Sequence, residues 1–322
     1  MKKVSTFFLK FIFLILLLYL ILRKVDTNRI YDEFKHINLI YFIISAFFYF
    51  ISTFTAAFQW RYLLKIQNIK ISYPEVLEFT YMGLFFNSFL PSSTGGDVYK
   101  VYKAGKKTSN WGRILSATFL DRVYGFIVLI LIGLFGTIIS FSYLVDKKLI
   151  VFISLIAFLF FMIITLLIVI SEKVFLITTY ILEKFRLDNL IPILKNFRLY
   201  TIFTIKQKKI LIIFFISFLT QMLRIISNYY AAKSLNVDIP FVLFLSFIPI
   251  IGTAVAIPIS FGGVGVREYL SMELFGNFTT LEKAILMQTL AYLGTLIVNS
   301  LGIFVLIYDW FFKREKLEIE NG

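Results

Sequence analysis

The chain has 322 residues, of which 59% are apolar, 19% are aromatic and only 16% are charged. Soluble domains are about 45–50% apolar and about 25% charged, so this composition excludes an ordinary soluble domain. The 33 basic and 19 acidic residues give a net charge of +14, but the basic residues lie between long apolar runs, which argues against a nucleic-acid module. The absence of cysteine excludes disulfides and thiolate metal sites, and the single histidine, His36, cannot form a histidine-rich metal site.

Six apolar segments are predicted to cross the roughly 30 Å hydrocarbon core of a bilayer as helices. They are 7–22, 39–60, 114–141, 149–170, 210–231 and 283–309. The first follows Lys2 and Lys3 as a signal peptide would, but no A-x-A cleavage site comes after it, so we interpret it as a retained first helix. The sequence therefore predicts an all-α polytopic membrane protein.

Two further segments, 76–96 and 240–262, are less apolar and are broken by proline and glycine. Such segments either cross fully or re-enter on the same side. Charge placement decides between these options, because cytoplasmic loops favour Lys and Arg. The loop 98–113 carries five basic residues and no acid, so we expect it inside the cell.

The same rule places both termini, 61–75 and 171–209 inside, and the charge-poor loops 142–148 and 232–239 outside. Each broken segment then begins and ends on one side, so we predict two re-entrant hairpins that enter from opposite faces. The segment 171–209 mixes apolar and basic residues and predicts an interfacial amphipathic helix, broken at Pro192, that contacts anionic lipid headgroups.

The two broken segments resemble each other. Residues 91–100 are PSSTGGDVYK and residues 258–267 are PISFGGVGVR. At an offset of 167 residues, both have Pro at the first position, Ser at the third, Gly-Gly at the fifth and sixth, and a basic residue at the last. The same offset carries the predicted spans of the first half onto those of the second. We expect a single membrane domain, 1–322, with repeat halves at about 1–141 and 149–309. Because the halves begin on opposite sides, this is an inverted-topology repeat, a plan that places a transporter's binding site between the halves near the midplane.

The glycines of the two motifs are candidate ligand-binding residues. Successive backbone N–H groups at Gly95–Gly96 and at Gly262, Gly263 and Gly265 can form an anion-binding nest, which would suit a lipid phosphate or carboxylate. The alternative is that these glycines only make tight turns, with Asp97 capping the next helix.

Ionisable residues within the apolar segments are the second group of candidates, because a charge at membrane depth is costly and usually pairs or lines a wet cavity. They are Asp97, Asp121, Arg122, Arg224, Arg267 and Glu268. We expect Asp97 and Glu268 to be counter-ions for Arg122 and Arg267. Arg224 lies near the end of its span, so snorkelling to the surface explains it equally well. Asn87 either bonds at depth or makes a local turn.

At these residues the chain resembles the flippase-like membrane domain of the lysylphosphatidylglycerol synthase/flippase family. The family's N-x-x-x-P-x-x-x-G-G-D-x-x-[RK] element, its Asp-Arg pair and its P-x-x-x-G-G-x-G-x-R-E element occur in order, with Lys100 where Arg is common. The predicted lipid-headgroup site comprises Asn87, Gly95, Gly96, Asp97, Lys100, Asp121, Arg122, Pro258, Gly262, Gly263, Gly265, Arg267 and Glu268.

The resemblance implies a multi-pass protein of the cell membrane that moves a charged or glycosylated lipid between leaflets, whether an anionic phospholipid or a polyprenyl-linked glycolipid, without a cofactor. A glycosyltransferase or another envelope enzyme is an expected partner. Because only residues 310–322 follow the last predicted span, we expect no tRNA-dependent aminoacyl transfer. Two other classes remain open: a lipid-modifying transferase that uses Asp97, Asp121 or Glu268 as a base, and an accessory subunit of an envelope synthase. No Walker A motif supplies an energy source.

Overall fold

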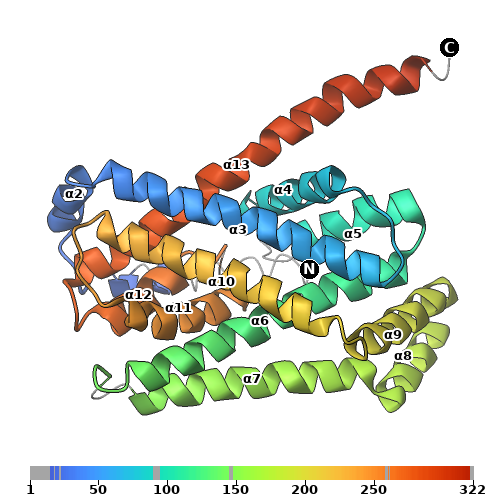
Figure 1. Cartoon of the computed structure of the whole chain (residues 1–322), viewed down its shortest axis with the longest axis horizontal. Helices are drawn as coiled ribbons and strands as arrows, with labels where there is room; N and C mark the ends of the chain where they lie inside the picture. Colours follow the sequence, from blue (N-terminus) through green and yellow to red (C-terminus); the bar gives the residue numbers. More distant parts are fainter. Residues whose placement is uncertain are drawn as a thin grey trace.

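The computed structural model describes residues 15–17, 19–21, 23–89, 95–144, 148–257, 260 and 262–319. All secondary structure in these ranges is helical (Figure 1). In chain order the elements are α2 (Thr27–Lys35), α3 (Leu39–Ile66), α4 (Tyr73–Phe89), α5 (Gly95–Thr108), α6 (Trp111–Ile139), α7 (Lys148–Ile170), α8 (Glu172–Lys184), the short 3-10 helix η1 (Asp188–Leu190), α9 (Ile191–Ile205), α10 (Ile210–Lys233), α11 (Phe241–Ala256), α12 (Val266–Phe275) and α13 (Leu281–Ile319).

Five stretches of the described chain are long and apolar enough to cross a membrane: α3, α6, residues 151–170 of α7, α10, and residues 281–305 of α13. They confirm five of the predicted spans. The predicted first span, 7–22, lies mostly outside the described residues. The start of α3 illustrates how local sequence sets a boundary, because the Asn38 side chain accepts hydrogen bonds from the N–H groups of Ile40 and Tyr41.

Each broken segment contains one short helix, α4 or α11, and this helix packs against a second short helix, α5 or α12, that lies mostly or wholly beyond the predicted end of the segment. We call α4 with α5 the first helix pair, and α11 with α12 the second. In the first pair the backbones meet at Gly83 and Gly96, where a Cβ added to Gly96 would lie 2.8 Å from the Gly83 Cα. The second pair is joined by a turn in which Gly262, Gly263 and Gly265 all have positive φ, a conformation that other residues adopt only with strain.

The segment 171–209 differs from the expected interfacial helix broken at Pro192. The helix breaks after Lys184, the last residue of α8, and not at Pro192, which lies in the first turn of α9. Proline is compatible with that position because the first-turn N–H groups have no partner within the helix. In α8 no residue is buried, whereas α9 packs on α6.

A buried polar network fixes α9 in the bundle. Gln67, at the end of α3, donates through Nε2 to Ser116 of α6 and to Thr204 of α9, at 3.0 and 3.1 Å. Thr201 also donates to Ser116, at 3.0 Å. These four side chains are fully buried, so α9 belongs to the packed protein, while α8 has only exposed and half-exposed residues.

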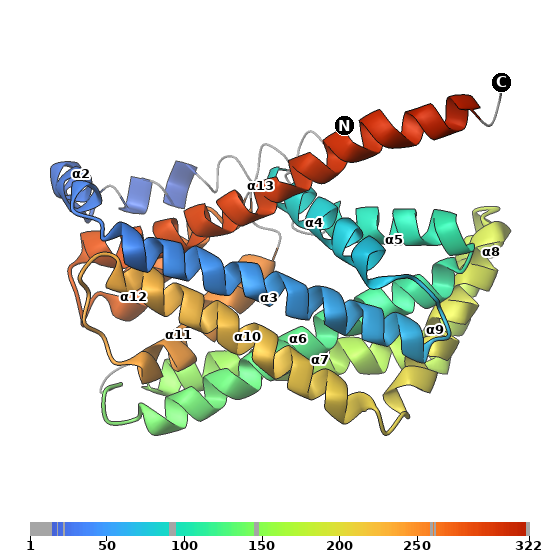
Figure 2. The ribbon, with the colours of Figure 1, turned by 45° about the horizontal axis from the view of Figure 1, so that its top comes forward.

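Helices of the two halves pack in matched combinations. The long helices α3 and α10 lie side by side, α4 packs on α13, and α11 packs on α6 (Figures 1 and 2). Glycine allows both of the last two contacts: a Cβ at Gly302 of α13 would meet the Tyr81 carbonyl at 2.7 Å, and one at Gly136 of α6 would meet Leu245 at 2.6 Å. Each long helix thus receives a short helix from the other half.

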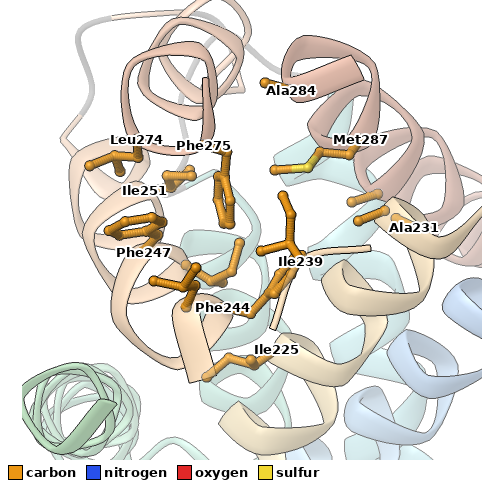
Figure 3. Close-up of a cluster of buried hydrophobic side chains, with 14 of the residues drawn as sticks. Ile225, Ala231, Ile239, Phe244, Phe247, Ile251, Leu274, Phe275, Ala284 and Met287 are labelled. Atoms are coloured by element: carbon orange, nitrogen blue, oxygen red, sulfur yellow. The ribbon is translucent and has the colours of Figure 1, made fainter. Parts of the chain in front are cut away.

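Two apolar cores lie beside these contacts. One is built around Phe244, Phe247 and Phe275, with ring centroids 5.0 and 4.9 Å apart for the two contacts that Phe275 makes (Figure 3). The other surrounds Trp60 and Ile114, where α3 packs against α6. The basic segments 98–113 and 171–209 lie at the same end of the molecule, and the turn between α12 and α13 lies at the opposite end (Figures 1 and 2).

Candidate functional site

A cavity of about 370 Å³ lies between the two halves and is lined by residues of α3, α4, α5, α6, α10, α11, α12 and α13. Its size is that of a site for a small molecule or a headgroup. Charged residues contribute four cations and one acid: Lys100, Arg122, Arg224, Arg267 and Asp121. The uncharged polar side chains of the lining are Tyr49, Gln59, Thr80, Thr220, Gln221, Ser227, Asn228, Gln288, Tyr292 and Thr295, and the rest of the lining is apolar residues and glycines.

Arg122 is held by the start of α5. Its Nε donates to Asp97 Oδ2 at 2.7 Å, and the two side chains are 45% and 18% exposed. Asp97 lies in the first turn of α5, where a carboxylate also interacts favourably with the helix dipole. The expected Asp97–Arg122 ion pair is therefore confirmed.

Asn87 has a local role in the same region. Its side-chain oxygen accepts a hydrogen bond from the Gly96 N–H at 2.7 Å. This bond ties the end of α4 to the start of α5 and occupies one N–H group of the Gly95–Gly96 motif. Of the two alternatives for Asn87, the structure shows the local turn bond.

Arg267 is held in a different way. Its guanidinium donates to the backbone carbonyls of Gly262 and Gly263 and stacks on the Tyr292 ring, with Cζ 3.8 Å from the ring centroid. The positive-φ turn thus presents carbonyl groups to Arg267. We expected Glu268 to be the counter-ion of Arg267, and no such ion pair forms among the described residues.

Glu268 instead caps its own helix. Its carboxylate accepts from the Gly265 N–H at 2.7 Å, which is the acidic half of a capping box, because glycine has no side chain to make the reciprocal bond. The spacing of three residues between the helix cap and an acid is the signal for this role in the sequence. The Gly265 N–H is consequently satisfied within the protein.

The remaining two cations have few partners. Lys100 is buried, and its Nζ lies 4.7 Å from the centroid of the Trp60 ring, a cation–π contact. The guanidinium of Arg224 has no hydrogen bond or ion pair within the described part of the chain, and its Nε is fully buried. Arg224 faces the cavity, so snorkelling toward the end of the span does not account for it.

Residues 7–306 match the protein family described as "Lysylphosphatidylglycerol synthase TM region". The chain belongs to this family. A curated relative, a UPF0104 membrane protein of Pyrococcus horikoshii, is 30% identical over 86 residues. That alignment covers 26% of this chain and 26% of the relative, so the chain spans about a quarter of the length of the curated relative it matches. No solved structure matches the chain.

The family motifs contribute to the cavity unevenly. Of the predicted headgroup residues, Lys100, Asp121, Arg122 and Arg267 line it, and Asp97 adjoins it through Arg122. Asn87, Gly95, Gly96, Gly262, Gly263, Gly265 and Glu268 are not part of the lining and shape the two turns that position it. Pro258 lies outside the described residues.

Several lining residues lie outside the predicted headgroup site. Arg224 is a candidate from its charge but belongs to none of the motifs, and Tyr49, Asn228, Gln288 and Tyr292 are not among the predicted residues. Asn228 and Gln288 form one hydrogen bond across the cavity wall, from Gln288 Nε2 to Asn228 Oδ1 at 3.0 Å. An amide or phenol within an apolar span was the available signal, but only the packing of α10 on α13 brings these side chains together.

Proposed function

We propose that this chain is a lipid translocase that holds an anionic or glycosylated lipid headgroup in the cavity between its two halves while the acyl chains stay in the bilayer. The observation that carries this proposal is the excess of cations in a cavity built by both halves. Four cations against one lining carboxylate would be costly to keep in a membrane protein interior without an anionic ligand.

The sequence repeat supports the location of the site. Residues 167 positions apart line the cavity in pairs, among them Lys100 with Arg267, Asp121 with Gln288, and Leu84 with Ile251. The cavity is therefore where corresponding positions of the two halves meet, as expected for a binding site on the axis of an inverted repeat. We propose that the two helix pairs are the re-entrant hairpins of that repeat.

The distribution of basic residues supports an orientation. The segments 98–113 and 171–209 carry much of the positive charge and lie at one end of the molecule. We propose that the protein lies in the cell membrane, that this end faces the cytoplasm and that both termini lie on that side.

Reconstitution in liposomes tests the function directly. Fluorescent phosphatidylglycerol, a fluorescent polyprenyl diphosphate and a neutral glycolipid are placed in both leaflets, and a membrane-impermeant quencher reports which of them exchanges between leaflets. Protein-dependent exchange of an anionic lipid is expected. Exchange of none of the three would contradict the translocase, and turnover of a lipid into a new product would indicate a transferase.

Arg267→Lys is the variant that connects transport to the cavity. Lysine keeps the charge but lacks the planar guanidinium that binds the glycine carbonyls and stacks on Tyr292, so exchange should fall about tenfold or more while thermal stability in detergent stays close to native. The matched control is Lys106→Arg, an exposed position on α5 outside the cavity lining. Equal transport by the two variants would separate the activity from this cavity.

A further inference from the structure

Arg224 is the least satisfied charged group in the cavity. A guanidinium has five N–H donors in a planar fork, and buried polar groups in proteins almost always have hydrogen-bond partners. Arg224 forms no side-chain hydrogen bond or ion pair among the described residues, and its Nε is fully buried in the cavity wall. Such a group points to a ligand whose atoms would supply the missing acceptors.

The surrounding charges define how much negative charge that ligand carries. Arg122 is neutralised by Asp97. Lys100, Arg224 and Arg267 have no carboxylate within ion-pair distance in the described ranges. Asp121 lines the same cavity, and its carboxylate offsets one of these three positive charges. Glu268 lies outside the lining, with its carboxylate bound to the Gly265 N–H. Two positive charges remain in excess.

The three cations also come from different elements. Lys100 is on α5, Arg224 on α10 and Arg267 on α12, so they approach the cavity from the first helix pair, a long helix of the second half and the second helix pair, respectively. A singly charged phosphodiester would leave one cation without compensation. A phosphate monoester carries about two negative charges above its second pKa near 6 and offers three acceptor oxygens, and a diphosphate diester also carries two.

We propose that Arg224 is the specificity-determining residue of this site and that it selects a lipid headgroup carrying two negative charges, as a phosphate monoester or a diphosphate, over a phosphodiester. In this arrangement the fork of Arg224 grips two phosphate oxygens, and Lys100 and Arg267 neutralise the group from either side. Asp121 remains available to accept a hydrogen bond from a hydroxyl next to the phosphate. The inference rests on the proposed function for the lipid nature of the ligand, whereas the phosphate chemistry can be tested alone.

The experiment measures thermal unfolding of the purified full chain in detergent at pH 8 and constant ionic strength. The probes are inorganic diphosphate, methyl phosphate and dimethyl phosphate, each titrated separately, since a ligand of the folded state raises the unfolding temperature by an amount that grows with the ratio of its concentration to its Kd. Diphosphate and methyl phosphate should act at concentrations about tenfold or more below dimethyl phosphate. Equal potency of the three probes would overturn the proposed selectivity.

The variant Arg224→Gln should remove this preference and bring diphosphate and methyl phosphate to the potency of dimethyl phosphate. Without ligand, its unfolding temperature should equal or exceed the native value, because the change removes an uncompensated charge. A structural arginine would instead lower it. Lys233→Gln on the same helix is the control, since Lys233 pairs with the exposed Asp238, and it should keep the native preference. Native selectivity in Arg224→Gln would overturn the role of Arg224.

Dodecyl phosphate separates a lipid source from a soluble one. If the phosphate belongs to a lipid, dodecyl phosphate should stabilise the protein at lower concentrations than methyl phosphate, and equal potency would overturn the lipid assignment. The outcome is independent of transport. Diphosphate binding without lipid exchange in liposomes would contradict the translocase alone, and exchange without selective phosphate binding would contradict this inference alone.

Discussion

The Asp97–Arg122 ion pair joins the start of α5 to the middle of α6 at the edge of the cavity. Asp97→Asn removes one partner and leaves Arg122 without its counter-ion, so we expect a loss of about 1–3 kcal/mol. The range is below that for a fully buried pair because the Arg122 side chain is 45% exposed. Adding Arg122→Gln should recover part of the stability but no transport. Thermal unfolding of the single and double variants measures the coupling, and strictly additive effects would mean that the two groups do not interact.

The contact between Gly83 and Gly96 gives a second prediction for a single residue. Gly96→Ala places a Cβ 2.8 Å from the Gly83 Cα, against backbone that cannot rotate away as a side chain could. We expect a loss of about 1–3 kcal/mol from overpacking. Gly294→Ala is the control, since its nearest neighbours, atoms of Ala46, lie at an ordinary 3.6 Å. An unfolding temperature that fell equally in both variants would argue against a specific backbone contact.

The roles of some charged residues in the site could be predicted from the sequence, and those of others could not. Asp97 and Arg122 could be paired in advance, because two opposite charges in apolar segments need each other. The same argument pairs Glu268 with Arg267. Glu268 lies three residues after Gly265, however, so its carboxylate can reach the Gly265 N–H within the first turn of its own helix. The orientation of Arg224 depends on which face of α10 packs against α3 and α13, and the residues around Arg224 do not indicate which face this is.

At the scale of elements, the first helix pair is closed at its base by Glu75 of α4 and Lys107 of α5, which form an ion pair. Hydrogen bonds from Lys107 and Ser72 hold the pKa of Glu75 below its ordinary value. Because the folded pKa is the lower one, the stabilisation is complete above the ordinary carboxylate pKa of about 4.3 and is lost as the pH falls through the folded value.

We therefore expect native stability to fall between about pH 5 and pH 3, by no more than about 1 kcal/mol from this half-exposed pair. Glu75→Gln should be less stable than the native protein at pH 7 and should show a smaller loss on acidification. Unfolding temperatures across that pH range measure the effect, with Asp188→Asn, in the exposed η1, as the control. A native-like acid profile in Glu75→Gln would show that the pair is not a source of stability.

The elements were predicted better than their contacts. Hydropathy located the described spans, because length and apolar composition suffice to identify a membrane helix. The break predicted at Pro192 was misplaced, because proline is acceptable in a first turn and the preceding helix had already ended at Lys184. The attachment of α9 to α6 rests on buried Thr201 and Thr204, and two threonines in a mixed segment give no sign of being buried.

At the scale of the whole molecule, the proposed inverted repeat predicts which ends of the protein are accessible from each side of the membrane. Because the native chain has no cysteine, single cysteines can be introduced at the exposed positions Lys106 and Asn277. In sealed cells a membrane-impermeant reagent should label Asn277→Cys and spare Lys106→Cys, and permeabilisation should expose both. Labelling of Lys106→Cys alone in sealed cells would contradict the proposed orientation, and labelling of both variants would contradict the placement of the α5–α6 and α12–α13 turns on opposite sides of the membrane.

The ion pairs of the first helix pair have no counterparts in the second. The positions 167 residues after Glu75, Asp97, Lys107 and Arg122 are occupied by Val242, Val264, Leu274 and Thr289. One half therefore closes through charges, whose attraction weakens as salt is added, and the other closes through backbone hydrogen bonds and apolar contacts. If the halves exchange shapes during transport, the inward-facing and outward-facing states differ in free energy even without lipid. The unloaded protein would rest in one of them, and ionic strength would change the proportion of the two.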